Sequence, residues 1–180
     1  MSTYEAAAFP VRQGPRVELK QLRAEEGGRL MELFAQPEVA PHIMLHRKNG
    51  PLRSQLDMLV YRMLQGSDPR ALHSGIYVCG GQEMIGTVSL QSWNRHERTA
   101  VLGYMLDPVW WGQGLATEAV GLLLDYGRRE LGLMRVEGRC RGGNIRSERV
   151  MLKNGLSLER ILPMPGSSGD VMKVFTLLHK

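Results

Sequence analysis

The spacing of apolar residues predicts alternating strands and helices over most of this chain. Runs in which apolar and polar residues alternate, or in which β-branched and aromatic residues dominate, are typical of strands and lie at 16–22, 76–79, 84–90, 99–106, 134–140, 156–162 and 171–178. Apolar residues three and four apart indicate helices at 24–35, 51–65, 115–131 and 144–153. The pattern therefore predicts an α/β (α+β) fold.

The order of these elements predicts how the strands pair. Segments 76–79 and 84–90 flank a glycine-rich turn and form a predicted hairpin, which 99–106 extends to a meander. The helix at 115–131 then joins 99–106 to 134–140 by short links, and such a crossover gives a parallel pair. We therefore expect one parallel pair inside a mixed, mostly antiparallel sheet.

The length of 180 residues suits a single domain with a substantial core. We expect residues 1–15 to be a flexible arm before a domain at 16–180. No apolar run approaches the roughly 18 residues of a membrane span, and the first residues do not have the pattern of a signal peptide. Cys79 and Cys140 lie in apolar surroundings without ligand spacing, which indicates structural thiols and a reducing compartment. We therefore expect a cytoplasmic protein without a membrane partner.

The formal net charge of +5 changes this picture little, because most basic residues are scattered. One cluster follows the longest helix and comprises Arg135, Arg139, Arg141, Arg146 and Arg149. It is either a solvated surface or a rim that faces phosphate, and RNA binding is a third reading. We expect no nucleic-acid partner except in a ribosomal context.

Two histidines, His42 and His46, have the spacing of a helical metal pair. No third ligand follows at suitable spacing, and a protein zinc site needs at least three. We therefore expect no metal.

The stretch from Trp110 to Ala119 carries the strongest chemical signal, because it joins a predicted strand to a predicted helix through two glycines. Glycine permits backbone conformations barred to other residues, and the following helix start offers unpaired N–H groups to an anion. A P-loop needs Lys where this chain has Leu115, and a dinucleotide fingerprint needs a third glycine where it has Thr117. A tight connection without a ligand is the alternative.

In combination, several motifs resemble the GNAT superfamily of acetyl-CoA-dependent N-acetyltransferases. They are GYMLDPVWWGQGLATEAVGLLLDYG at 103–127, Asn144-x-x-Ser147 after the next strand, and MLKNGL at 151–156. The resemblance extends from Arg16 to Leu178 and looks nearest to the RimJ/RimL-like branch of ribosomal-protein N-terminal acetyltransferases. It implies a single-domain GNAT-like fold with a six- to seven-stranded sheet and helices on both faces.

The resemblance also implies acetyl-CoA as co-substrate and assigns residues to it. The coenzyme pyrophosphate would bind the signature stretch, which comprises Trp111, Gly112, Gln113, Gly114, Leu115, Ala116 and Thr117. Trp111 stands where the family has Gln or Arg, so we expect no side-chain phosphate contact there. Pantetheine would contact Asn144 and pair with the backbone of Met105 and Leu106, where strand 99–106 splays from its parallel neighbour.

The catalytic residues are less well marked. Ser147 matches a family position near the thioester sulfur and is the candidate proton donor, although Asn144 and Ser147 also suit a helix cap. The tyrosine that many relatives use one turn later is Met151 here, and the usual glutamate base is Val101. By proximity in sequence, the candidate bases are His96 and Glu97, and a water relay is the alternative.

The leading hypothesis is an N-acetyltransferase that acts directly on a primary amine, most simply a protein N-terminus such as that of a ribosomal protein. An α-amine, with a pKa near 8, needs less help from a base than a lysine or polyamine amine, with a pKa of about 10. The alternatives are a small-molecule amine acceptor (polyamine, amino acid or antibiotic) and a non-catalytic coenzyme-binding module. A monomer and a homodimer are both compatible with the sequence.

Overall fold

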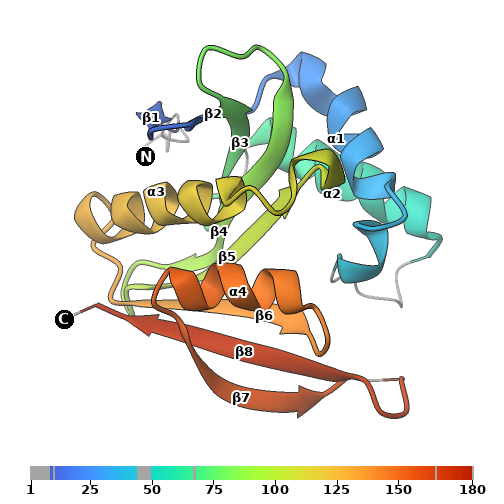
Figure 1. Cartoon of the computed structure of the whole chain (residues 1–180), viewed down its shortest axis with the longest axis vertical. Helices are drawn as coiled ribbons and strands as arrows, with labels where there is room; N and C mark the ends of the chain where they lie inside the picture. Colours follow the sequence, from blue (N-terminus) through green and yellow to red (C-terminus); the bar gives the residue numbers. More distant parts are fainter. Residues whose placement is uncertain (1–8, 10, 44–49, 67, 165, 180) are drawn as a thin grey trace, which may run out of the picture.

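One mixed sheet with helices on both faces organises the computed structural model, which describes residues 9, 11–43, 50–66, 68–164 and 166–179 (Figure 1). In sheet order the strands are β1 (Arg12–Gln13), β2 (Val17–Gln21), β3 (Leu72–Val78), β4 (Met84–Asn94), β5 (Thr99–Leu106), β6 (Arg135–Arg141), β8 (Val171–Leu178) and β7 (Ser157–Pro163). The helices are α1 (Gly27–Ala35), α2 (Leu52–Gln65), α3 (Leu115–Arg129) and α4 (Ile145–Lys153), with short 3-10 turns η1 (Ala24–Glu26), η2 (Ala40–His42) and η3 (Pro108–Trp110).

The predicted topology is confirmed, with two corrections at the amino-terminal end. Strands β5 and β6 are parallel and the other pairs are antiparallel. The sheet has eight strands rather than six to seven, because Arg12 pairs with Leu19 and adds β1 at the edge. Phe9 is only 4% exposed and stacks against Tyr126 of α3. The predicted arm at 1–15 therefore packs on the domain from Phe9 onward, wherever the structure describes it.

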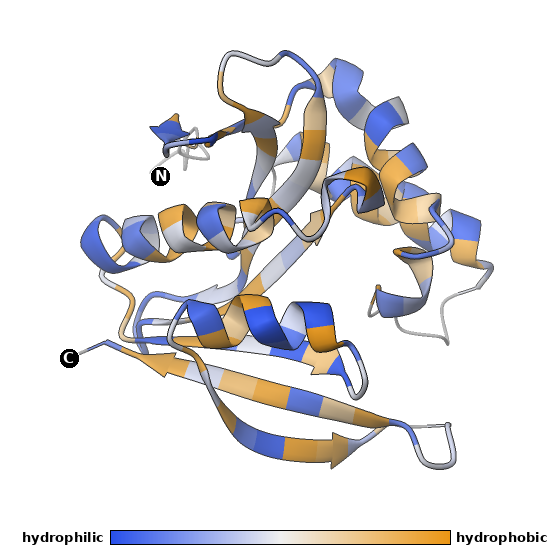
Figure 2. Cartoon of the chain, in the orientation of Figure 1, coloured by the Kyte–Doolittle hydropathy of each residue, from blue (hydrophilic) through white to orange (hydrophobic). Residues whose placement is uncertain are grey.

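Two apolar cores lie on opposite faces of the sheet. Helices α3 and α4 cover the larger core, in which Leu123, Val136 and Met151 are fully buried. Helices α1 and α2 cover the smaller one, built around Leu30 and Leu33. Figure 2 shows apolar and polar residues alternating along α3 and α4, as expected of helices that bury one side. The sheet is thus fixed from both faces, and its middle strands are rigid supports for a site.

The parallel pair separates halfway along β5. Pairing with β6 covers only Thr99–Leu102 against Arg135–Gly138. Beyond that point β5 continues beside β4 up to Leu106, whereas β6 continues beside β8 up to Arg141. Residues 103–106 therefore have no strand on the β6 side, although unpaired backbone groups inside a protein are costly. We name this opening between β5 and β6 the splay.

Candidate functional site

The loop before α3 presents unpaired backbone donors beside the splay. Gly112 and Gly114 have φ of 76° and 80°, a left-handed conformation that other residues adopt only at a cost. Gly114 is the N-cap residue, and no side chain caps the helix there. The first bond inside the helix runs from the Glu118 N–H to the Gly114 carbonyl at 3.1 Å. The N–H groups of the preceding turn, Leu115 to Thr117, are therefore free of intrahelical partners and suit an anion.

A latch from the start of β2 holds this loop, and sequence reasoning missed it. Arg16 donates from Nη1 to the Gln113 carbonyl at 2.7 Å and from Nε to Glu118 Oε2 at 2.9 Å. Glu118 Oε1 also accepts from the backbone N–H groups of Arg16 at 2.7 Å and Val17 at 3.1 Å. About 100 residues separate the partners, so no local pattern could reveal the contact. The latch fixes the loop and the first turn of α3 to the sheet.

Replacing Glu118 by Gln should weaken the latch in a pH-dependent way. Burial opposes ionisation of Glu118, but the bonds from Arg16 and Val17 outweigh it and hold the carboxyl pKa below its ordinary value of 4.5. A lowered folded-state pKa gives stability that is present above the unfolded pKa and is lost as pH falls through the folded one. We expect the variant to lose about 1–3 kcal/mol of unfolding free energy at pH 7.

Urea unfolding at several pH values provides the measurement. The difference between the native chain and Glu118→Gln should shrink as pH falls below the ordinary value of 4.5. The matched control is Asp125→Asn, which disrupts an exposed pair with Arg129 on the same helix and should cost about 0–1 kcal/mol. A difference that stays constant down to acid pH would show that the carboxylate charge does not act in the latch.

The backbone of β5 turns alternate residues toward the splay. The Asp107 N–H bonds the Ile85 carbonyl at 2.8 Å, and the Met105 carbonyl oxygen abuts Gly86 on β4. Because successive residues of a strand face opposite neighbours, Tyr104 and Leu106 direct their backbone groups to the splay. The backbone groups of Met105 therefore face β4, and of the residues in this part of β5 it is Tyr104 and Leu106 whose backbone is open to a ligand in the splay.

The Trp111 side chain connects the loop to two neighbouring elements. Its indole Nε1 donates to the Leu106 carbonyl at 2.8 Å, which ties the loop to the end of β5. The guanidinium of Arg146 on α4 lies 4.8 Å from the centre of the indole ring. Trp111 thus connects the end of β5 to α4 at the mouth of the splay, and the Arg146 guanidinium contacts its ring.

Two hydroxyl groups meet inside the splay. Tyr104 donates to the Ser147 carbonyl at 2.9 Å, and the two hydroxyl oxygens are 2.7 Å apart. Burial raises the pKa of Tyr104, and the bond with Ser147 only partly offsets this, so the phenol stays protonated at neutral pH. The sequence indicated Ser147 as a candidate, but gave no indication that Tyr104 contacts it.

The remaining side chains near this pair are inert or structural. Asn144 caps α4, with Oδ1 accepting from the Ser147 N–H at 3.2 Å, as the alternative prediction required. Met151 is fully buried in the core. Burial, with the nearby Glu148 charge, raises the pKa of the Cys140 thiol to about 11, so it is a poor nucleophile at neutral pH. Both cysteines are free, as expected.

His96 and Glu97 are not brought to the hydroxyl pair. Both lie in the exposed β4–β5 turn, where their N–H groups donate to Asn94 Oδ1. Tyr104 is five residues beyond Thr99, the first residue of β5, which is about 17 Å at strand spacing. The two residues therefore stand at the opposite end of β5. Their nearness in sequence to the strand was misleading.

The carboxylate nearest to the missing base position is also engaged. Glu137 on β6 pairs in register with Val101. Its oxygens accept from Arg139 Nε at 2.6 Å and from Arg160 Nη2 at 3.1 Å. Both oxygens of this carboxylate are thus occupied by guanidinium groups. The Val101 position thus has no free carboxylate beside it on β6.

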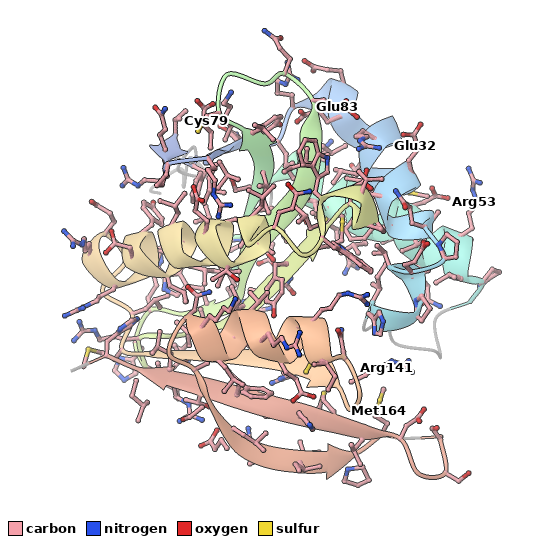
Figure 3. The ribbon with its side chains drawn as sticks, viewed as in Figure 1. Glu32, Arg53, Cys79, Glu83, Arg141 and Met164 are labelled. Carbon is pink, nitrogen blue, oxygen red and sulfur yellow. The ribbon has the colours of Figure 1, made fainter. Side chains whose placement is uncertain are left out.

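The predicted arginine cluster divides into two groups. Arg135 and Arg139 bond Glu159 and Glu137, and Arg141 lies 3.9 Å from Asp170 at the end of β6 (Figure 3). These three serve ion pairs of the sheet. Within the described residues, Arg146 and Arg149 on α4 form no ion pair. The second group therefore keeps its charge without a carboxylate partner among the described residues, whereas Arg141 has an ion-pair partner but a buried Nε without a hydrogen bond.

Of the two histidines with metal-pair spacing, only one lies in the described part of the chain. His42 is an exposed residue of η2, and His46 lies outside the described residues. No group of three or more possible metal ligands occurs in the part of the chain that the structure describes. None of the described helices is both long enough and apolar enough to cross a membrane.

Comparison with known proteins gives a consistent result. The family model described as "Acetyltransferase (GNAT) domain" matches residues 16–157. The uncharacterized N-acetyltransferase YoaA of Bacillus subtilis is 26% identical over 154 residues, which cover 86% of each chain. The ribosomal-protein-serine acetyltransferase of Escherichia coli is 35% identical over 80 residues, which cover 44% of this chain and 45% of the other.

The fold also matches solved structures. RimL, a ribosomal L7/L12 α-N-protein acetyltransferase solved with coenzyme A, superposes with a TM-score of 0.74 at 20% identity. The match covers 94% of this chain and 98% of that one. At this identity the superposition establishes the shared fold.

Proposed function

Because this chain belongs to the acetyltransferase (GNAT) domain family, we propose that it transfers the acetyl group of acetyl-CoA to the N-terminal α-amine of a protein. The observation that carries the proposal is the splay, where the unpaired half of β5 lies between the uncapped start of α3 and the Tyr104–Ser147 pair. An extended thiol-bearing arm with a phosphate group at its far end fits that arrangement.

Each part of the site has a task in this reaction. The N–H groups of Leu115 to Thr117 would hold the pyrophosphate. The backbone of Tyr104 and the N–H of Leu106, whose carbonyl already accepts from Trp111, would pair with the pantetheine arm. The co-substrate supplies the thioester. Backbone N–H groups that β5 turns into the splay would polarise the thioester carbonyl.

The transfer step consists of nucleophilic attack, cleavage of the thioester and two proton transfers. A neutral amine attacks the carbonyl carbon, a C–N bond forms, and the C–S bond breaks with its electron pair on sulfur. The attacking nitrogen releases a proton to water. The Ser147 hydroxyl gives its proton to the thiolate and regains one from solvent. Tyr104 keeps it oriented when the phenol donates its single proton to the Ser147 hydroxyl instead of the Ser147 carbonyl.

An α-amine suits the site better than a lysine side chain. Val101 supplies no carboxylate and Glu137 beside it is engaged by arginines, so the amine must lose its proton without a strong base. An α-amine has a pKa of about 8 and is partly neutral at pH 7 to 8, whereas a lysine amine has a pKa of about 10.4. The names of RimL and the Escherichia coli relative support the same acceptor class.

A thiol-release assay tests the proposal. The chain should release free coenzyme A from acetyl-CoA in the presence of short peptides with free N-termini, and mass spectrometry should find the acetyl group on the α-amine. The same peptides with a blocked N-terminus and an internal lysine are the control. Release with polyamines or free amino acids but not with peptides would overturn the protein acceptor. Coenzyme binding without release with any amine would overturn catalysis.

A further inference from the structure

A basic cavity lies between η2 and the first turns of α4. It has a volume of about 350 Å³ and is lined by His42, Gly143, Asn144, Ile145, Arg146 and Arg149. This size is at the lower end of the roughly 300–1,000 Å³ of small-ligand sites. No carboxylate belongs to the lining, so the cavity favours an anion.

The charge of this cavity is not neutralised by its neighbours. Arg146 and Arg149 lie three residues apart on one side of α4, and within the described residues neither has an ion-pair partner. Glu148, which lies between them in sequence, turns away and accepts from Lys173 of β8 at 2.8 Å. The three arginines of β6 each have a carboxylate partner, whereas these two on α4 have none among the described residues. The cavity therefore carries excess positive charge.

The cavity opens next to the reacting groups. Asn144 lines it, and the same side chain accepts from the N–H of Ser147, whose hydroxyl bonds Tyr104. Arg146 stacks on Trp111 at the mouth of the splay. A ligand in the cavity would thus lie beside Asn144, the residue that holds the N–H of Ser147.

We propose that this cavity binds an acidic side chain of the acceptor peptide, within the first few residues after the amine. The inference rests on the proposed function and specifies its substrate class. The coenzyme pyrophosphate would use the N–H groups at the start of α3, and no residue of that loop lines the cavity. An extended peptide advances about 3.3 Å per residue, so a carboxylate two to four residues from the amine can reach α4.

Matched peptides test the proposal. They share one N-terminal residue and differ only in Glu or Gln at the second to fourth positions. The native chain should show a higher kcat/KM with the Glu peptides than with the Gln peptides. The double variant Arg146→Ala/Arg149→Ala should have a kcat/KM for the Glu peptides that is about two- to ten-fold lower. The Gln peptides and the KM for acetyl-CoA should change little. Arg128→Ala, at the exposed far end of α3, is the control and should leave both peptide classes unchanged.

Three other outcomes overturn the inference. Equal losses with Glu and Gln peptides and a raised KM for acetyl-CoA would assign the arginines to the coenzyme. Peptide acetylation without preference would remove the acidic acceptor and leave the proposed function standing. Failure of the native chain to acetylate any peptide would remove both.

Discussion

Replacing Ser147 by alanine should lower kcat about 100-fold or more, with little change in the KM for acetyl-CoA. The reason is that the hydroxyl is the one we assign to the leaving thiolate, and a positioned proton donor typically contributes 10²–10⁴-fold, roughly, to such a step. The substitution removes no core packing, because Ser147 is half-buried and its N–H keeps its bond to Asn144. Steady-state kinetics at saturating peptide measures the effect.

The Tyr104–Ser147 bond adds a second part to this result. Tyr104→Phe should lower kcat about ten-fold, because the serine hydroxyl loses the 2.7 Å partner that orients it. If Tyr104 acts through Ser147, the double variant should be no slower than Ser147→Ala alone. Tyr126→Phe, which removes another partly buried phenol hydroxyl on α3, is the matched control. Independent, multiplicative losses would mean that Tyr104 acts on the substrate directly.

Replacing Gly86 by alanine should be the most damaging single change to the scaffold of the site. A methyl group there would collide with the Met105 carbonyl oxygen and lie 3.0 Å from the Leu106 Cα, both backbone atoms of β5. Such overpacking costs about 1–3 kcal/mol or more, and strand β5 must shift at the splay to relieve it. We expect a Tm lower by several degrees and a higher KM for acetyl-CoA.

Thermal unfolding and coenzyme binding check this prediction together. Gly28→Ala on α1 is the control, because a methyl group there meets nothing within 4 Å and alanine favours a helix. It should raise the Tm slightly and leave kinetics unchanged. A Gly86→Ala chain with native Tm and native coenzyme affinity would show that β5 is not held against β4 as described.

The fold was predictable where local periodicity and burial agree. Strand β5 was predicted with its observed bounds, Thr99–Leu106, because β-branched and aromatic residues fill it and Asp107-Pro108 ends it. The pair Arg12–Gln13 is too short for a period, so β1 was missed. Phe9 carries no pattern of its own, and its burial in the larger core, where its ring contacts Tyr126 of α3, depends on residues far away in sequence.

The site was predictable only where a motif is continuous in sequence. The glycine loop and the Asn144 cap are such motifs, and both have the expected geometry. The Arg16–Glu118 latch and the Tyr104–Ser147 pair join segments 102 and 43 residues apart, and side-chain contacts at that range leave no local trace. His96 and Glu97 were chosen because they lie close in sequence to β5. An extended strand separates sequence neighbours quickly in space, so they lie at the opposite end of β5 from Tyr104.

The short pairing of β5 with β6 divides the sheet into two parts, and we name this pairing the seam. Four residue pairs form that seam, with β1 to β5 on one side and β6, β8 and β7 on the other. Tyr104 belongs to the first part of the sheet, and Ser147 lies on α4, which follows β6 in the second part. Their hydrogen bond therefore connects the two parts across the splay. A substitution in these four residue pairs would therefore shift Tyr104 relative to Ser147. It would lower the rate of transfer even if the altered residue does not contact the substrate.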